Sequence, residues 1–121
     1  MTSEQIDRFL TFLRECEQGV HMAETDEQEA NSATQDILHS LELEDHDYRT
    51  YAKLGKELRG VRRKRREAKD RLSVLALVLD WAEANRATIK SLERLLGDVR
   101  KAEKYTENRI YTPRTKRYMG K

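Results

Sequence analysis

Arginine supplies most of the candidate chemistry in this sequence. Five consecutive cations occupy residues 62–66, and Arg109 and Arg114 alternate with tyrosines and β-branched residues near the C-terminal end. The planar guanidinium group binds phosphate oxygens through paired hydrogen bonds. Both stretches are therefore candidates for holding a phosphate-bearing ligand. The simpler interpretations are a layer of ion pairs inside the fold for residues 62–66 and a solvated tail for the C-terminal stretch.

Two pairs of acidic residues have the spacing of a metal-dependent hydrolase. Glu24 with Glu27 forms an ExxE pair, and Glu67 with Asp70 forms an ExxD pair. These pairs superficially resemble those of all-α nucleoside triphosphate pyrophosphohydrolases, whose carboxylates must converge on magnesium. The helical periodicity places Glu27 inward but Glu67 and Asp70 on the outer face of the second helix. We therefore do not expect the two pairs to converge.

Other catalytic sets are not evident. His21, His39 and His46 are scattered along the chain, with no cluster of the Cys/His type that binds zinc. Cys16 falls on an apolar helix position, where a small buried residue is expected. The sequence therefore predicts no catalytic group, metal site or cofactor. A single cysteine cannot form an internal disulfide, which suits a reducing cytoplasm.

The composition predicts one elongated helical domain, residues 1–121. The hydrophobic fraction is 37% and the charged fraction 38%, which is too polar for a compact globule and too apolar for a disordered chain. The 24 cations nearly cancel the 22 anions, so nucleic acid is not favoured as a partner of the whole chain. The longest apolar run, residues 74–79, is too short to span a bilayer. We expect no membrane partner and a cytoplasmic location, the host cytoplasm if a phage encodes the chain.

A seven-residue apolar repeat predicts two long helices, residues 3–43 and 47–84. The alternating intervals of three and four are the a/d pattern of a coiled coil. A short acidic turn separates the helices, with Asp47 as the N-cap of the second, so the pair should be antiparallel. The first helix contributes Ile6, Phe9, Leu13, Cys16, Val20, Ala23, Glu27, Ala30, Thr34, Ile37 and Leu41. The second contributes Tyr51, Leu54, Leu58, Val61, Arg65, Ala68, Leu72, Leu75, Leu79 and Ala82.

The predicted register pairs two charged residues inside this seam. Glu27 is expected to face Arg65, and the acidic residues 24–29 are expected to lie alongside residues 62–66 and neutralise them. A register-setting ion pair is the simpler interpretation, and a polar waist with room for a ligand is the alternative. Gly55 and Gly60 are expected to permit close backbone approach, because each costs about 1 kcal/mol relative to alanine inside a helix.

A third helix, residues 86–105, and a basic arm, residues 106–121, complete the predicted all-α fold. The apolar face of the third helix consists of Ile89, Leu92, Leu96 and Val99. Residues 72–81 are so apolar that they need cover on more than one side, and a second copy of the chain is the simplest source. We therefore expect a coiled-coil-like antiparallel hairpin that assembles as a homo-oligomer, a dimer or larger.

Three stretches give the chain a resemblance to a known family. They are residues 36–43 (DILHSLEL), 65–70 (RREAKD) and 108–114 (NRIYTPR). With them the chain resembles the Thoeris anti-defence sponge family, small phage proteins that sequester cyclic ADP-ribose signals made by TIR-domain enzymes. The resemblance implies a homo-oligomer that binds a cyclic nucleotide with a pyrophosphate and does not cleave it.

The resemblance also implies a site with an aromatic platform for the base and arginines for the phosphates. Trp81 and Arg109 are the positions matched to these two roles, and Asn85 is a candidate hydrogen-bond partner for the base or ribose. The alternative for Trp81 is an ordinary core position. The expected ligand-binding residues are Arg65, Trp81, Asn85, Asn108, Arg109, Tyr111 and Arg114.

The expected function is therefore that of a phage counter-defence protein that sequesters a cyclic nucleotide immune signal. The alternative is a helical adaptor or a nucleic-acid-associated protein of a phage or mobile element. Basic residues 62–66 and the C-terminal arm would supply the phosphate contacts in the nucleic-acid case.

Overall fold

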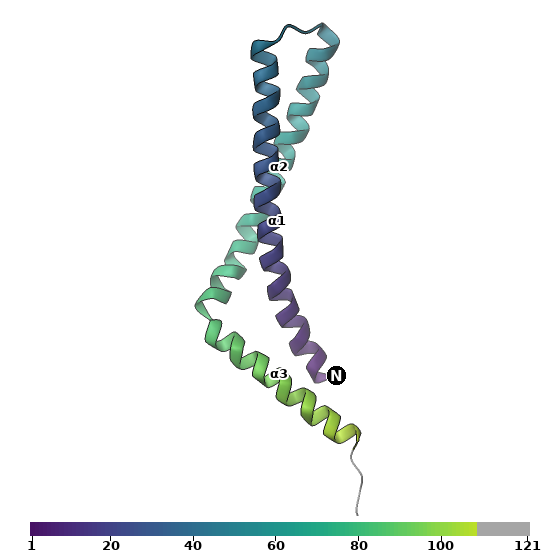
Figure 1. Ribbon diagram of the computed structural model, residues 1–121, viewed down its shortest axis with the longest axis vertical. Coiled ribbons are helices and arrows are strands. Elements are labelled where there is room, and N and C mark those ends of the chain that lie inside the picture. The colour runs from purple at the N-terminus through teal and green to yellow at the C-terminus, as the bar shows by residue number, and fades with distance from the viewer. Residues whose placement is uncertain (109–121) are drawn as a thin grey trace, which may run out of the picture. The chain divides into compact units, whose positions relative to one another are not determined.

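The computed structural model describes residues 1–108, which form three helices and no strand. Helix α1 spans Thr2–Leu43, α2 spans Tyr48–Ala84 and α3 spans Arg86–Glu107 (Figure 1). The all-α class and the pair of long helices are confirmed. From residue 109 onward the predicted basic arm lies outside the described residues.

The chain divides into two compact units. One is Thr11–Arg86, which contains most of α1 and all of α2. The other combines Met1–Leu10 with the chain from Ala87 onward. Across residues 1–108, no helix combines the length and the apolar character needed to cross a membrane.

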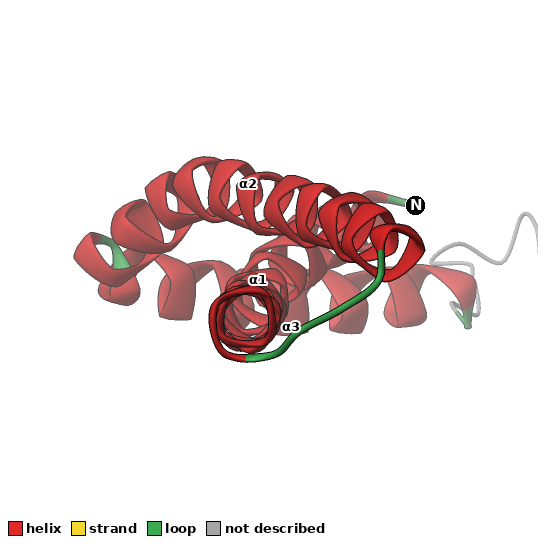
Figure 2. Cartoon of the chain, turned by 90° about the horizontal axis from the view of Figure 1, so that it is seen from above, coloured by secondary structure: helices red, strands yellow, loops and turns green. Residues whose placement is uncertain are grey.

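The helix pair packs through a narrow seam of small and branched side chains. Figure 1 shows α2 beside α1 near the connection and then crossing it, and Figure 2, with α1 nearly end-on, shows the oblique course of α2. Ala23 and Ala68 are fully buried. The predicted repeat of α1 is confirmed in this unit, where the buried α1 side chains are Leu13, Cys16, Val20, Ala23, Ala30 and Ile37. On α2 the predicted seam position at Tyr51 is wrong, because Tyr51 is 38% exposed. Because the helices cross, they contact each other over only part of their surface. Much of α2 therefore remains exposed.

Gly19 of α1 is the glycine at which an added methyl group would meet a side chain of the other helix. A Cβ built there would lie 2.8 Å from Cδ1 of Leu75. The close approach predicted at Gly55 and Gly60 is wrong, because a Cβ at either position would meet nothing within 4 Å. The contact depends on where the helices cross, which the apolar repeat does not specify.

Gly55→Ala is expected to stabilise the helix pair by about 0.5–1 kcal/mol, because alanine loses less backbone entropy on entering a helix. Nothing opposes the added methyl group. Urea unfolding followed by circular dichroism measures the change. Gly19→Ala is the matched control, because the same gain in helix propensity is offset by the contact with Leu75. Equal stabilisation by both substitutions would mean that the Leu75 side chain moves aside without cost. A loss of stability in Gly55→Ala would contradict the open space at that position.

The polar contacts between α1 and α2 lie about one helical turn from the predicted register. Arg65 Nε donates a 2.6 Å hydrogen bond to Asn31 Oδ1, and Arg71 Nη2 lies 2.8 Å from Asp26 Oδ2. Within residues 1–108 Glu27 forms no ion pair with Arg65, so that predicted pair is wrong. The apolar repeat fixes the inward face of each helix. Sliding one helix by a turn leaves that pattern almost unchanged.

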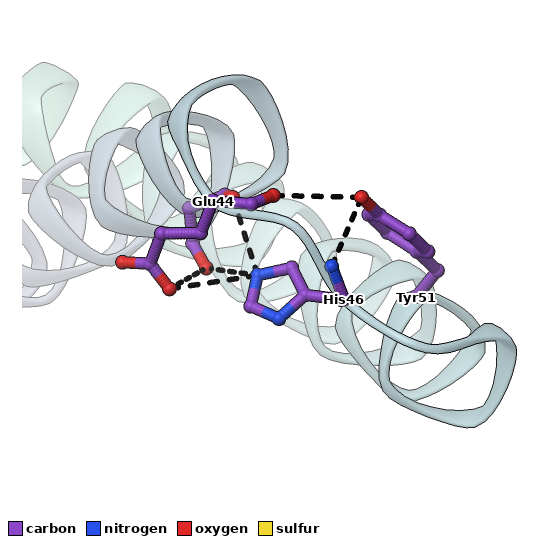
Figure 3. Close-up of polar contacts among 4 residues, drawn as sticks. Glu44, His46 and Tyr51 are labelled. Carbon is purple, nitrogen blue, oxygen red and sulfur yellow. Dashed lines mark hydrogen bonds and ion pairs between the residues drawn. The ribbon is translucent and has the colours of Figure 1, made fainter.

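A cluster of polar contacts closes the connection between α1 and α2 (Figure 3). Nε2 of His46 lies 2.9 Å from Ser40 Oγ and 3.5 Å from Glu44 Oε2. The Tyr51 hydroxyl accepts from the His46 backbone N–H and donates to the Glu44 carbonyl oxygen. Serine and carboxylate approach the same imidazole nitrogen, whereas an activated serine needs the carboxylate on the other one. The cluster therefore fixes the connection and is not a catalytic triad.

Asp47 caps α2 as predicted, because its Oδ1 accepts a 2.8 Å hydrogen bond from the Thr50 N–H. Hydrogen bonding by the Thr50 side chain, and then by its backbone N–H, lowers the pKa of Asp47 below its ordinary value of 3.8. A carboxyl whose pKa is depressed in the folded state stabilises the protein above its unfolded pKa. That contribution is lost as the pH falls through the folded pKa.

Asp47→Ala is therefore expected to lower the Tm at pH 7, and the difference from wild type should disappear as the pH falls well below 3.8. Thermal melts across this pH range measure the difference. Asp45→Ala removes a carboxylate from the same connection without removing the cap. If both variants melt alike at pH 7, the cap does not contribute as described.

In the second unit, the start of α1 packs on α3. Leu10 and Leu96 are buried. The Ser3 N–H donates a 3.3 Å hydrogen bond to Oε2 of Glu103. Hydrogen bonding by the Ser3 side chain, and to a smaller extent by its backbone N–H, lowers the pKa of the Glu103 carboxyl below its ordinary value. The contact places a negative charge at the N-terminal end of α1, where the helix dipole favours it.

The predicted apolar face of α3 is confirmed. Leu96 is buried, and Ile89, Leu92 and Val99 are half-buried. The predicted seam position at Phe9 is wrong, because Phe9 is 40% exposed and its neighbour Leu10 is buried. The first ten residues bury the side that meets α3, so the repeat that serves the α1–α2 seam does not continue through them.

Candidate phosphate-binding face of the second helix

The outer face of α2, opposite the seam, carries a row of cations. We call Arg59, Arg62, Arg63, Arg66 and Lys69 the cationic row; all five are exposed. Their intervals of three and four residues keep them on one side of the helix. They line a shallow groove together with Gly55, Leu58, Arg65 and Asp70. At about 1.5 Å per residue the row covers about 15 Å of the helix axis.

The cationic row is unpaired. No ion pair or hydrogen bond within residues 1–108 joins these five side chains to another protein group. The expectation that residues 24–29 neutralise residues 62–66 is therefore wrong for Arg62, Arg63 and Arg66, whereas Lys64 lines a groove between the helices with Asp26 and Glu29. Of that acidic stretch, only Asp26 forms an ion pair with α2 in the described chain, and its partner is Arg71. Arg65 differs from the row because it lies nearer the seam and bonds Asn31.

The nearest charged neighbours of the row are mostly other cations. Arg62 follows Arg59 by three residues and precedes Arg66 by four. Like charges at these spacings destabilise a helix by about 0.2–0.5 kcal/mol per pair. Glu67 and Asp70 are the carboxylates at comparable spacing, and neither forms an ion pair with the row in the described residues. The row thus lowers helix stability and leaves its guanidinium groups available to an anion.

The same face of α2 becomes apolar toward its C-terminal end. Val74 is 63% exposed, Leu77 71% and Trp81 46%. Their intervals of three and four residues place them on one side of the helix, and we call them the apolar stripe. The expectation that residues 72–81 need cover on more than one side agrees with this exposure. The oblique crossing of the two helices leaves the stripe open to another molecule.

Trp81 and Asn85, two of the predicted ligand residues, lie one turn apart. The Asn85 side-chain amide donates a 2.8 Å hydrogen bond to the Trp81 carbonyl oxygen, and its backbone N–H bonds the Ala82 carbonyl. Asn85 therefore ends α2, and its amide N–H is engaged in the cap. Half of the Trp81 side chain remains accessible as a flat apolar surface.

The other predicted ligand residues do not join Trp81 in this unit. Arg65 is about 24 Å away along the α2 axis and bonds Asn31. Asn108 belongs to the other unit, where its amide donates to the backbone of α3. Arg109, Tyr111 and Arg114 lie outside the described residues. Of the seven predicted residues, Trp81 and Asn85 are the pair that the described structure brings together.

The two carboxylate pairs do not form a metal site. Glu67 lines a groove between α1 and α2 that also contains Asp26 and Glu29. Asp70 lines the groove of the cationic row, so Glu67 and Asp70 face different grooves. No group of three or more His, Cys, Asp or Glu residues in residues 1–108 could hold a metal ion.

Arg59 and Lys69 are candidate site residues that the sequence interpretation missed. The prediction treated residues 62–66 as one basic site, although consecutive residues point in different directions on a helix. The useful signal was the spacing of 59, 62, 63, 66 and 69 on positions opposite the apolar repeat. That spacing separates the row from Arg65, which the run includes.

Comparison with known proteins gives no relative: no family model, curated protein or solved structure matches the chain. The features of the described chain that bear on function are therefore the side chains on α2. Two properties of these side chains matter most, namely the unpaired charge of the cationic row and the exposure of the apolar stripe.

Proposed function

We propose that the protein is a phage-type counter-defence sponge that binds a cyclic nucleotide signal of the cyclic ADP-ribose type without cleaving it. The observation that carries the proposal is the change, along one face of α2, from the cationic row to the apolar stripe. A nucleotide uses both surfaces, because its phosphates are anionic and its base is flat and stacks on apolar side chains. Arg66 and Val74 are eight residues apart, so the stripe begins about two turns, or about 12 Å along the axis, beyond Arg66.

In this proposal Trp81 is the platform for the base. Its indole is half accessible and is continued along the helix by Leu77 and Val74. Arg66 and Lys69 are the row members nearest the stripe, and they bind phosphate oxygens. Arg109, which the resemblance to the sponge family matches to the phosphates, and Arg114 of the predicted arm lie outside the described residues.

The proposed assembly is a homo-oligomer with the ligand between protomers. The exposed apolar stripe supports it, because a second copy that covers Val74 and Leu77 removes their surface from water at about 25 cal/mol per Å². Native mass spectrometry on protein purified from cells that make the signal measures the oligomeric state and any retained nucleotide at once. A multimer that carries retained nucleotide is the expected result, and a nucleotide-free monomer would count against the assembly.

The binding itself is tested by thermal melts with isomers of cyclic ADP-ribose and with cyclic oligonucleotides. A ligand stabilises the protein by RT ln(1 + [L]/Kd), or about 2.7 kcal/mol at a hundredfold excess over Kd. At least one isomer is expected to raise the Tm, and Trp81→Ala should remove most of the rise. Phe12→Ala is the matched control, because Phe12 is an aromatic side chain of similar exposure, 47%, on α1. Equal loss in both variants would exclude Trp81 as the platform.

A further inference from the structure

The cationic row is longer than the phosphates of one cyclic nucleotide require. Its length of about 15 Å equals the axial rise of four to five phosphates on one strand of a duplex, at about 3.4 Å each. We propose that the outer face of α2 binds the sugar–phosphate backbone of a nucleic acid. This activity is separate from the proposed sponge function and does not rest on it.

The charge around the row is strongly positive although the whole chain is nearly neutral. Between Lys53 and Arg71 there are ten cations and three carboxylates, against a net charge of +2 for the full sequence. In residues 1–108, Arg65 and Arg71 are the members of this group that contact α1. Lys64 lines the groove between α1 and α2 with Asp26 and Glu29. The five cations of the row face solvent, where a phosphate backbone would release its condensed counterions on binding.

The arrangement of the row argues against a purely structural role. Its five side chains are exposed and make no contact that holds α2 to α1. Arg59, Arg62 and Arg66 also repel one another along the helix. A bound strand of phosphates would attract each of these cations and so offset the repulsions, whereas water and salt only screen them.

The same features favour nucleic acid over an anionic membrane. In a helix that lies in a membrane interface, cations and apolar side chains occupy opposite sides of the same turns. On α2 the cations of residues 59–69 and the apolar side chains of residues 74–81 occupy different turns of one side. The cationic stretch has the form of a linear phosphate contact. Because such contacts carry no base information, the binding should be independent of sequence.

The test is fluorescence anisotropy with a labelled DNA duplex of about 20 base pairs, measured from about 50 to 200 mM salt. Wild type should show a slope of log K against log salt of about −4, from four to five phosphate contacts. The triple variant Arg59→Gln, Arg62→Gln, Arg63→Gln should flatten the slope by about 2.7 and weaken binding at least about tenfold. The corresponding lysine triple, which keeps the three charges, should retain the slope.

The matched control removes the same charge from α3 through Lys90→Gln, Arg94→Gln and Lys101→Gln. These residues are exposed cations outside the row, so this control should bind like wild type. Equal weakening of both triples would show that net charge alone matters and would overturn the proposal. Wild-type binding to phosphatidylserine vesicles with none to DNA would also overturn it.

Two further measurements separate this proposal from misfolding and from the sponge function. The glutamine triple should melt no lower than wild type, because it relieves repulsion along α2. It should also keep any Tm rise caused by a cyclic nucleotide, because Trp81, Arg66 and Lys69 are unchanged. Loss of DNA binding together with a collapsed melt in both the glutamine and the lysine triples would assign the residues to folding and contradict the proposal.

Discussion

Leu13→Ala is expected to destabilise the α1–α2 unit by about 2–3 kcal/mol, the lower part of the range for buried Leu→Ala changes. Leu13 is 8% exposed and belongs to the group of buried side chains that hold α1 to α2. The substitution removes apolar contact area and leaves a cavity. The narrow seam allows its neighbours to relax, which limits the cost. The Tm should fall by about 10–20 °C, which a thermal melt followed by circular dichroism measures.

The control for Leu13→Ala is Leu43→Ala at the other end of α1. Leu43 is 76% exposed, so its truncation should change the free energy of unfolding by less than about 0.5 kcal/mol. A comparable loss at both positions would mean that helix propensity, and not burial in the seam, determines the effect.

The second large effect is expected from overpacking of the α1–α2 seam at Ala68. Ala68 is fully buried, so Ala68→Leu must push α2 away from α1 or adopt a strained rotamer. The expected cost is about 1–3 kcal/mol. Urea unfolding measures the cost through the shift of the midpoint.

Ala52→Leu is the matched control for Ala68→Leu, because Ala52 is an exposed alanine of the same helix. Leucine is almost as good a helix former as alanine, so this control should be nearly neutral. If Ala68→Leu is also neutral, the two helices are not in close contact at that level.

The sequence was sufficient for the helices and for the inward face of each one. Apolar residues recur every three or four positions because one face of each helix is buried and that face returns with every helical turn. Val20, Ala23 and Ile37 are buried for this reason, and they lie where the repeat placed them. The N-cap at Asp47 could also be predicted, because the cap is a local contact in which the Asp47 side-chain oxygen accepts from an N–H three residues later in the chain.

The contacts between the helices could not be predicted from the sequence in the same way. Arg65 bonds Asn31 and not Glu27, since a slide of one turn keeps the same residues inward. Gly19, which meets Leu75, was indistinguishable in the sequence from Gly55, which meets nothing. Such contacts depend on the angle and the crossing point of two helices, and residue spacing within one helix does not encode either.

The candidate site was predictable only in part. Trp81 and Asn85 lie together because they are one turn apart on the same helix, although the amide N–H of Asn85 is used in the cap. The unpaired state of Arg59 and Arg66 could not be inferred, because it depends on which acidic residues of α1 come within reach. The sequence predicted that acidic residues of α1 neutralise the basic run. The observed register does not bring those residues into ion pairs with Arg62, Arg63 or Arg66.

The two proposed functions share Arg66 and Lys69 and differ in the other residues of α2 that they use. The sponge function depends on the junction of the cationic row with the apolar stripe, and the nucleic-acid function depends on the length of the row. Trp81→Ala and the glutamine triple at Arg59, Arg62 and Arg63 therefore separate them. Each substitution should affect one ligand and spare the other.

The most direct test of the sponge proposal is isothermal titration calorimetry of the wild-type protein and Trp81→Ala with isomers of cyclic ADP-ribose. The proposal predicts that at least one isomer binds wild type and is recovered unchanged afterwards. It also predicts that Trp81→Ala loses at least about 1.4 kcal/mol of binding free energy, a tenfold weaker Kd. Absence of binding to every isomer, or undiminished binding by Trp81→Ala, would contradict it.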